Sequence, residues 1–257
     1  MRPRWSTSSS SDLRAPAESG RAKLVLEYDG GPFAGWAEQP GRRTVAGELR
    51  LALETVLRAP VHLSVAGRTD RGVHALGQVV SYAGALPRLR SVNAVLPGEI
   101  SVLFAEEVPE DFSARHAALS RSYLYRVLAR RSPSPFERGR ALHWPHAIDF
   151  DALQACATAL AGTHDFTAFT PTDTYHTRFD RRVLAAGWDQ VGDTLEFRIE
   201  ADAFMRQMNR TLVGTMLEVA GGRRSVDDFA ALLTGAPRSS AGKTAPSHGL
   251  YLAAVRY

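Results

Sequence analysis

The sequence predicts an α+β fold of two ferredoxin-like (βαββαβ) subdomains that form one extended, mainly antiparallel sheet. In the first half, apolar patterns follow one another in the order strand, helix, strand, strand, helix, strand. The second half repeats this order without repeating the sequence. We expect helices on one face of the sheet and a broad central cleft between the halves.

The chain divides into a tail and two subdomains. Residues 1–21 are expected to be a disordered N-terminal tail, because the run from Ser6 to Ser11 has no apolar core and no secretory signal precedes it. The N-terminal subdomain is expected at 22–115 and the C-terminal one at 116–257.

The first half starts with a strand from Lys23 to Tyr28, whose residues alternate with the period of a half-buried strand. A helix from Val45 to Leu57 follows, because its apolar residues share one helical face. Thr44 can cap its start, and Pro60 ends it. The other elements expected here are strands at 61–65, 78–82 and 100–104 and a helix at 89–96.

The second half begins with a strand from Ser122 to Leu128, followed by a Pro- and Arg-rich loop from Arg130 to Pro145. A turn at Val191-Gly192-Asp193 predicts a hairpin. The other elements expected here are helices at 150–161, 205–219 and 226–233 and strands at 182–190, 194–201 and 249–256.

Composition restricts the partners and the compartment. Lys and Arg exceed Asp and Glu by 31 to 27, which favours a polyanionic partner. The single cysteine, Cys156, excludes a disulfide framework and a four-cysteine zinc site, and it fits a reduced, cytoplasmic setting. No apolar run reaches the length of a membrane span, so we expect no membrane association.

No pattern predicts a metal or a nucleotide cofactor. His143 and His146 are three residues apart, but Pro145 lies between them and no carboxylate is near, which argues against zinc. The chain has neither a P-loop nor a Gly-x-Gly-x-x-Gly motif. We therefore expect no cofactor.

The stretch from Ala66 to Ala75 lies between two predicted strands and carries two glycines, a carboxylate and two arginines. Loops with rigid flanks are common places for binding and catalytic groups, although Asp and Gly are also ordinary turn residues. The string Gly67-Arg68-Thr69-Asp70-x-Gly72-Val73-His74-Ala75 resembles the signature of the tRNA pseudouridine synthase A family.

This resemblance covers roughly Ala22 to Tyr257 and implies an isomerase that converts uridine to pseudouridine at positions 38, 39 and 40 of the tRNA anticodon stem-loop. It implies that the central cleft binds RNA, that the enzyme is a homodimer and that Asp70 is the catalytic residue. Asp70 would attack the base or the sugar, or act as a base on the sugar, and the sequence leaves these routes open.

The resemblance assigns Arg210 as the arginine that pairs with Asp70. Helical spacing would place Arg206 on the same face, so Arg206 is an alternative partner, or both arginines only decorate a surface helix. Asn209 and Thr211 depart from the residues that the family commonly has beside this arginine.

Four further residues are carried over from the resemblance. Tyr123 would stack on the uracil, Arg68 would occupy the space that the base leaves, Arg115 would contact RNA, and Leu250 would line the pocket. Tyr123 and Tyr125 share one side of the predicted strand, so one of them could instead belong to the core. For Leu250, a place in the core is the simpler interpretation. Arg71 stands where the family has a small residue.

Two alternatives stay open. The departures at Arg71, Asn209 and Thr211 would suit an RNA-binding protein of the same fold without catalysis. The second alternative is a pseudouridine synthase with a different target uridine. The loops at 130–145 and 170–181 could reshape the RNA contacts and so change the target.

Overall fold

The computed structural model describes residues 20–174 and 176–257. Its strands are β1 (Arg21–Tyr28), β2 (Ser64–Val65), β3 (His74–Ala83), β4 (Ile100–Val108), β5 (Ser120–Leu128), β6 (Leu142–His143), β7 (Gly162–Asp165), β8 (Asp180–Val191), β9 (Thr194–Ala201) and β10 (Leu250–Arg256). The helices are α1 (Val45–Leu57), α2 (Leu89–Val95), α3 (Phe150–Ala159), α4 (Met208–Ala220) and α5 (Val226–Ala231), with short 3-10 helices η1 (Thr167–Phe169), η2 (Arg238–Ser240) and η3 (Ser247–Gly249).

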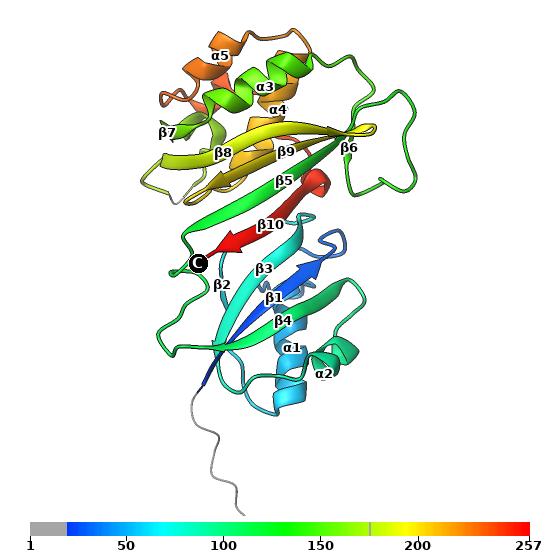
Figure 1. Cartoon of the computed structure of the whole chain (residues 1–257), viewed down its shortest axis with the longest axis vertical. Coiled ribbons are helices and arrows are strands. Elements are labelled where there is room, and N and C mark those ends of the chain that lie inside the picture. Colours follow the sequence, from blue (N-terminus) through cyan, green and yellow to red (C-terminus); the bar gives the residue numbers. More distant parts are fainter. Residues whose placement is uncertain (1–19, 175) are drawn as a thin grey trace, which may run out of the picture.

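The strands form one 10-stranded sheet in the order β4-β1-β3-β10-β5-β9-β8-β7, with β2 on β3 and β6 on β5 (Figure 1). The pairs are antiparallel except for β10 with β3 and β5 with β6. The expectation of a mixed α+β fold with a large, mainly antiparallel sheet is therefore confirmed.

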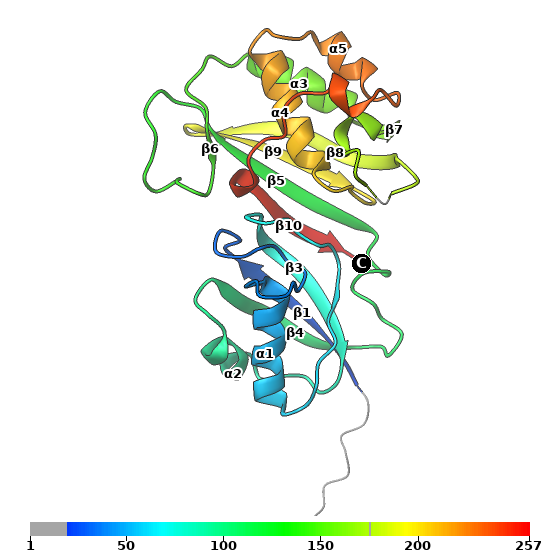
Figure 2. The ribbon, with the colours of Figure 1, turned by 180° about the vertical axis from the view of Figure 1, so that it is seen from behind.

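The first half of the sheet is covered by α1. Alternate residues of β1 from Ala22 to Tyr28 are buried, and they join one core cluster with the apolar stripe of α1, which includes Leu49 and Leu53. The helix starts where the Thr44 hydroxyl accepts a hydrogen bond from the Gly47 amide, at 3.3 Å. Figure 2 shows α1 in front of the sheet.

The second half is organised by α4, most of whose residues are buried against the sheet. The hairpin of β8 and β9 carries the aromatic pair Trp188 and Phe197, whose ring centroids are 5.1 Å apart and whose planes are tilted by 36°. In Figure 2, α4 lies on the same side of the sheet as α1.

The last strand joins the two halves. β10 lies between β3 and β5, where Tyr251 pairs with His74 and with Leu124. The C-terminal strand therefore brings Leu250 to the end of the loop that precedes β3 (Figure 1).

Several predicted boundaries are wrong. α4 starts at Met208 rather than at residue 205, because Gln207 has a left-handed backbone with φ 61° and does not continue a helix. β2 is confined to Ser64–Val65, and β3 begins at His74 rather than at residue 78. The short strands β6 and β7 were not predicted.

The predicted tail at 1–21 falls outside the described residues as far as residue 19, and Arg21 already belongs to β1. Within the described part of the chain, no helix combines the length and the apolar character needed to cross a membrane.

Candidate active site

A cleft of about 800 Å³ opens between the loop that precedes β3, the start of α4 and strand β5. Five of the predicted site residues line it: Arg68, Asp70, Arg115, Tyr123 and Leu250. The sixth, Arg210, contacts Asp70. The fold thus gathers residues from both halves of the chain around one cavity.

Asp70 and Arg210 form an ion pair, with 3.8 Å between Asp70 Oδ2 and Arg210 Nη1. Arg210 is held in place because its Nε donates a hydrogen bond to the Ala245 carbonyl at 2.7 Å. Burial raises the pKa of Asp70, and the positive charges of Arg210 and then Arg206 oppose that rise. The carboxylate is thus partly desolvated and close to a fixed cation.

The sequence spacing predicted that Arg206 shares a helical face with Arg210. This prediction is wrong, because α4 begins only at Met208. Arg206 lies before α4, lines the cleft and pairs with Asp173. Its charge acts on Asp70 from a greater distance, since only Arg210 is within ion-pair range among the described residues.

The loop around Asp70 is fixed by side chains from other strands. The hydroxyls of Tyr28 and Thr69 are 2.7 Å apart, and Gln78 Nε2 donates to the Gly67 carbonyl at 2.8 Å and to Tyr28 at 3.3 Å. Gln78 is fully buried. These contacts hold the residues on both sides of Arg68 while leaving Arg68 exposed.

Gly72 allows the loop to turn directly after Asp70. Its φ of 77° is in the left-handed region, and a Cβ there would lie 2.6 Å from the Ser247 hydroxyl. The glycine at this position of the motif therefore has a steric cause in this chain.

The two tyrosines of β5 have different surroundings. Tyr125 is completely buried and its hydroxyl donates to the Pro246 carbonyl at 2.8 Å, so it belongs to the core. Tyr123 lines the cleft, and its ring meets the edge of Phe204 at 4.9 Å with an interplanar angle of 76°. Tyr123 thus presents an aromatic ring to whatever occupies the cleft. Leu250 is 6% exposed and serves both core and cleft.

Arg121 is a residue of the cleft that sequence reasoning missed. Its guanidinium donates to the carbonyls of Ala66 and Arg115, at 2.9 Å each, and to that of Asp202 at 2.9 Å. No local spacing could have revealed it, because its partners are up to 81 residues away. Arg71 is exposed and is not among the residues that line the cleft.

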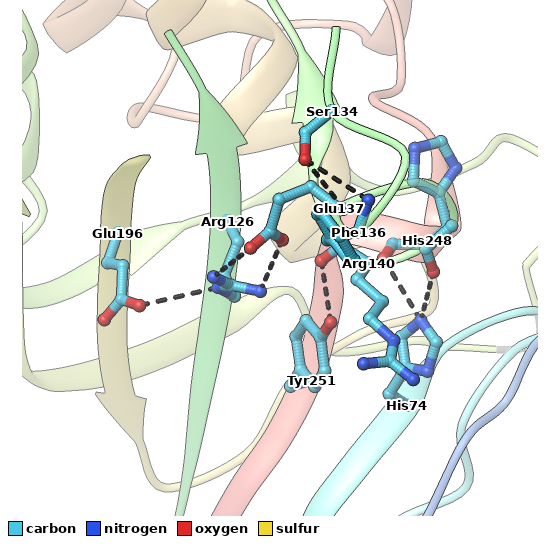
Figure 3. A network of polar contacts seen from close by, with 10 residues as sticks. His74, Arg126, Ser134, Phe136, Glu137, Arg140, Glu196, His248 and Tyr251 are labelled. Atoms are coloured by element: carbon cyan, nitrogen blue, oxygen red, sulfur yellow. Dashed lines mark hydrogen bonds and ion pairs between the residues drawn. The ribbon is translucent and has the colours of Figure 1, made fainter. Parts of the chain in front are cut away.

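His74, the first residue of β3, lies in a network of polar contacts that Figure 3 shows. Its Nε2 faces the carbonyls of Gly139 and His248, at 3.0 and 3.1 Å, so this nitrogen carries a proton. Its Nδ1 accepts from the Gly30 amide at 3.1 Å and lies 3.2 Å from Asp29 Oδ1. Burial lowers the pKa of the imidazole, and the Asp29 carboxylate opposes that shift. The ring stacks on Tyr251 at 4.6 Å. His74 is therefore a structural residue that ties the start of β3 to Gly30, Gly139 and His248.

The network around His74 also fastens the long loop at 130–145. Arg126 pairs with Glu137 at 2.8 Å and with Glu196 at 3.5 Å, and the Tyr251 hydroxyl donates to the Arg140 carbonyl at 2.7 Å (Figure 3). No described residue of this loop lines the cleft, whereas His176 of the 170–181 segment does.

The described residues contain no group of three or more His, Cys, Asp and Glu side chains that could hold a metal ion.

Known proteins resemble this chain over most of its length. The family model described as tRNA pseudouridine synthase matches residues 156–257. A tRNA pseudouridine synthase A from Bacillus pumilus is 41% identical and the match covers 92% of this chain and 99% of the relative. The chain belongs to the tRNA pseudouridine synthase A family. It is therefore an isomerase of the pseudouridine synthase class that acts on tRNA.

Other members of the tRNA pseudouridine synthase A family give the same result. The proteins of this name from Lacticaseibacillus casei and Paraburkholderia phytofirmans are each 41% identical, over 91% and 92% of this chain and 98% and 90% of their own lengths. Among solved structures, one titled "Crystal Structure of a Cbf5-Nop10-Gar1 Complex" aligns with a TM-score of 0.41 and 13% identity, over 78% of this chain and 44% of that one. That likeness is too distant to argue from.

Proposed function

We propose that this chain isomerises uridine to pseudouridine at positions 38, 39 and 40 of the tRNA anticodon stem-loop, with Asp70 as its catalytic residue. The observation that carries the proposal is the Asp70–Arg210 ion pair in a cleft that also presents the ring of Tyr123. A carboxylate beside a fixed guanidinium stays available as an anion although it is partly desolvated.

The reaction breaks the bond from uracil N1 to ribose and forms one from C5, with a proton lost from C5 and one gained at N1. The target base must leave its stack, because its reacting atoms are inaccessible in a helix. Asp70 would act on the extracted nucleotide, and Tyr123 would stack on its base, a contact typically worth about 1–3 kcal/mol.

The remaining cleft residues suit a structured polyanion. Arg68 and Arg115 are exposed at the cleft, where guanidinium groups can contact phosphate and stack on bases. Leu250, which pairs with Tyr125 on β5, supplies an apolar surface in the cleft that Tyr123 also lines. The proposed chemistry needs no metal, redox or nucleotide cofactor.

We extend the proposal to the architecture. The four main strands lie in the order β4-β1-β3-β2 in the first half and β10-β5-β9-β8 in the second. Counted along the chain within its own half, each order is the fourth strand, then the first, the third and the second. This shared order supports two ferredoxin-like subdomains divided near residue 115. We also propose a homodimer, which the family assignment implies. We propose a cytoplasmic location because tRNA is the proposed substrate.

Release of tritium from tRNA labelled at uracil C5 tests this function, because the label leaves only when C5 becomes attached to ribose. We expect release by the wild type and none by Asp70→Asn, with tRNA binding and folding retained. Asp193→Asn, in the exposed β8–β9 turn, is the matched control and should keep full activity. Appreciable release by Asp70→Asn would exclude Asp70 as the catalytic residue. Mapping the modified positions then separates positions 38–40 from another target uridine.

A further inference from the structure

Among the described residues, Phe136 is the most exposed large apolar side chain, at 85%. It lies in the Pro- and Arg-rich loop between β5 and β6, which projects from the side of the molecule in Figures 1 and 2. None of the residues of this loop lines the cleft. The contacts made inside the cleft therefore do not explain why the chain exposes this ring.

Hydrogen bonds fix the backbone next to this ring. The Ser134 hydroxyl accepts from the amides of Phe136 and Glu137, at 3.3 and 3.4 Å. The Glu137 carboxylate in turn accepts two hydrogen bonds from Arg126 on β5, at 2.8 and 3.2 Å (Figure 3). The backbone that carries Phe136 is thus held in place before any partner arrives, which lowers the entropic cost of binding.

The charges of the loop are mainly positive. Its only acidic residue, Glu137, is already in an ion pair. It contains four exposed arginines: Arg130, Arg131, Arg138 and Arg140. Arg130 pairs with Asp193 at 3.0 Å, whereas the side chains of Arg131 and Arg138 form no hydrogen bond or ion pair with a described residue. An exposed ring between such guanidinium groups suits a nucleic acid, because rings stack on bases and guanidinium groups bind phosphate.

The loop is well separated from the part of the cleft that binds the target base. Along β5, the five steps from Tyr123 in the cleft to Leu128 before the loop span roughly 17 Å. An RNA bound in the cleft therefore meets the loop with a part that lies away from the target nucleotide. A base that stacks on Phe136 has to be unpaired, because base faces are covered inside a double helix.

We propose that this loop is a second RNA-binding surface, on which Phe136 stacks with an unpaired base of the bound tRNA and Arg131 and Arg138 contact its phosphates. The proposal rests on the tRNA substrate of the proposed function, and it does not depend on which uridine is modified. The surface contributes to the affinity for tRNA and leaves the chemical step to the cleft.

Phe136→Ser tests the stacking contact. We expect the Kd for full-length tRNA to rise about fivefold to a hundredfold, since one base–aromatic stack is lost. In the tritium assay, kcat at saturating tRNA should keep its wild-type value, because the residue lies outside the cleft. The Tm should also stay unchanged, because the exposed ring buries little apolar surface.

Phe104→Ser is the matched control for the loss of an exposed ring. Phe104 is 50% exposed on the edge strand β4, and the same strand carries Glu106 and Glu107 close by. An aromatic ring beside acidic residues is a poor site for a polyanion. This variant should therefore keep the wild-type Kd for tRNA.

Arg138→Gln tests the phosphate contact. The Kd for tRNA should rise, and the slope of log Kd against log salt concentration should decrease by about 0.7–0.9, as one lost phosphate contact requires. Arg90→Gln is the control, because Arg90 is exposed on α2 in the first half of the chain and does not line the cleft. It should leave both the Kd and the slope unchanged.

Two results would overturn the proposal. A wild-type Kd for tRNA in Phe136→Ser would show that the ring does not contact RNA. A change in oligomeric state, measured by sedimentation, would make the loop an interface between copies of this chain instead. The proposed function fails separately: a wild type that binds tRNA through this loop but releases no tritium would refute the isomerase chemistry and leave the second RNA-binding surface in place.

Discussion

At the scale of single residues, two opposing effects set the protonation of Asp70. Burial raises the pKa of its carboxyl group, and the guanidinium of Arg210 is the first of the charges that lower it again. The proposed chemistry uses the carboxylate, so activity should rise as the pH passes upward through this pKa.

Replacing Arg210 by methionine removes the nearest opposing charge while keeping a long side chain. The pKa of Asp70 should then rise further, and the acid limb of the kcat/KM profile should move to higher pH. Measured at one acidic pH, the variant should therefore lose more activity than it does at alkaline pH. Arg224→Met, which removes a pair with Glu218, is the control and should leave the profile in place. An unshifted acid limb in Arg210→Met would show that Asp70 does not titrate in that limb.

At the scale of elements, the loop before β3 depends on a buried glutamine. Gln78 is fully buried on β3 and donates to Gly67 in the loop and to Tyr28 on β1. Gln78→Leu leaves the Gly67 carbonyl without this donor, and we expect the free energy of unfolding to fall by about 1–3 kcal/mol. The loop that carries Asp70 also loses an anchor, so kcat should fall.

Urea unfolding and the tritium assay measure these two effects of Gln78→Leu. Gln190→Leu is the control, because Gln190 is exposed beside the β8–β9 turn and its side chain donates a long hydrogen bond to the Gly192 carbonyl, at 3.4 Å. It should change stability by less than about 0.5 kcal/mol. Equal stability losses in the two variants would contradict the anchoring role of Gln78.

The same elements show what the sequence could predict. The apolar stripe of α1 and the predicted strand at 194–201 match the observed bounds Val45–Leu57 and Thr194–Ala201. Both elements were predictable because their apolar residues form one buried face. The strand β7 has four residues and begins with a glycine, so it is too short for a periodic pattern to reveal it. The start of α4 is set by the backbone of Gln207, a residue type that does not signal a left-handed turn.

The site was predictable only where a local motif carries it. The string around Asp70 is contiguous in the sequence, and its family resemblance pointed to the more distant site residues. The structure gathers these residues at one cleft, and their roles are proposals. Gln78 and Arg121 act through hydrogen bonds to distant backbone carbonyls. Such contacts follow from the tertiary fold and leave no spacing in the sequence.

At the scale of the whole molecule, the two halves meet along β10 and around Arg121. β10 hydrogen-bonds to β3 on one side and to β5 on the other (Figures 1 and 2). Arg121 connects the carbonyls of Ala66 before the Asp70 loop, Arg115 in the connecting segment and Asp202 after β9. One side chain thus fixes both walls of the cleft relative to each other.

Arg121→Met should therefore damage stability and activity together. It keeps much of the side-chain packing but removes the charged donors from four carbonyl groups, those of Ala66, Arg115, Ala118 and Asp202. We expect the free energy of unfolding to fall by about 2–3 kcal/mol. We also expect KM for tRNA to rise, because the walls that carry Asp70 and Tyr123 lose a shared support. Urea unfolding and steady-state tritium release measure the two effects.

The control for Arg121→Met is Arg198→Met on β9. Arg198 is 56% exposed and pairs with Glu196 and Asp189 at the surface, where such pairs contribute about 1 kcal/mol or less. If Arg121→Met lost no more stability than Arg198→Met, its hydrogen bonds would not hold the halves together. A stability loss with unchanged KM would instead show that the cleft keeps its shape without Arg121, and β10 would then be the element that sets the relative position of the two halves.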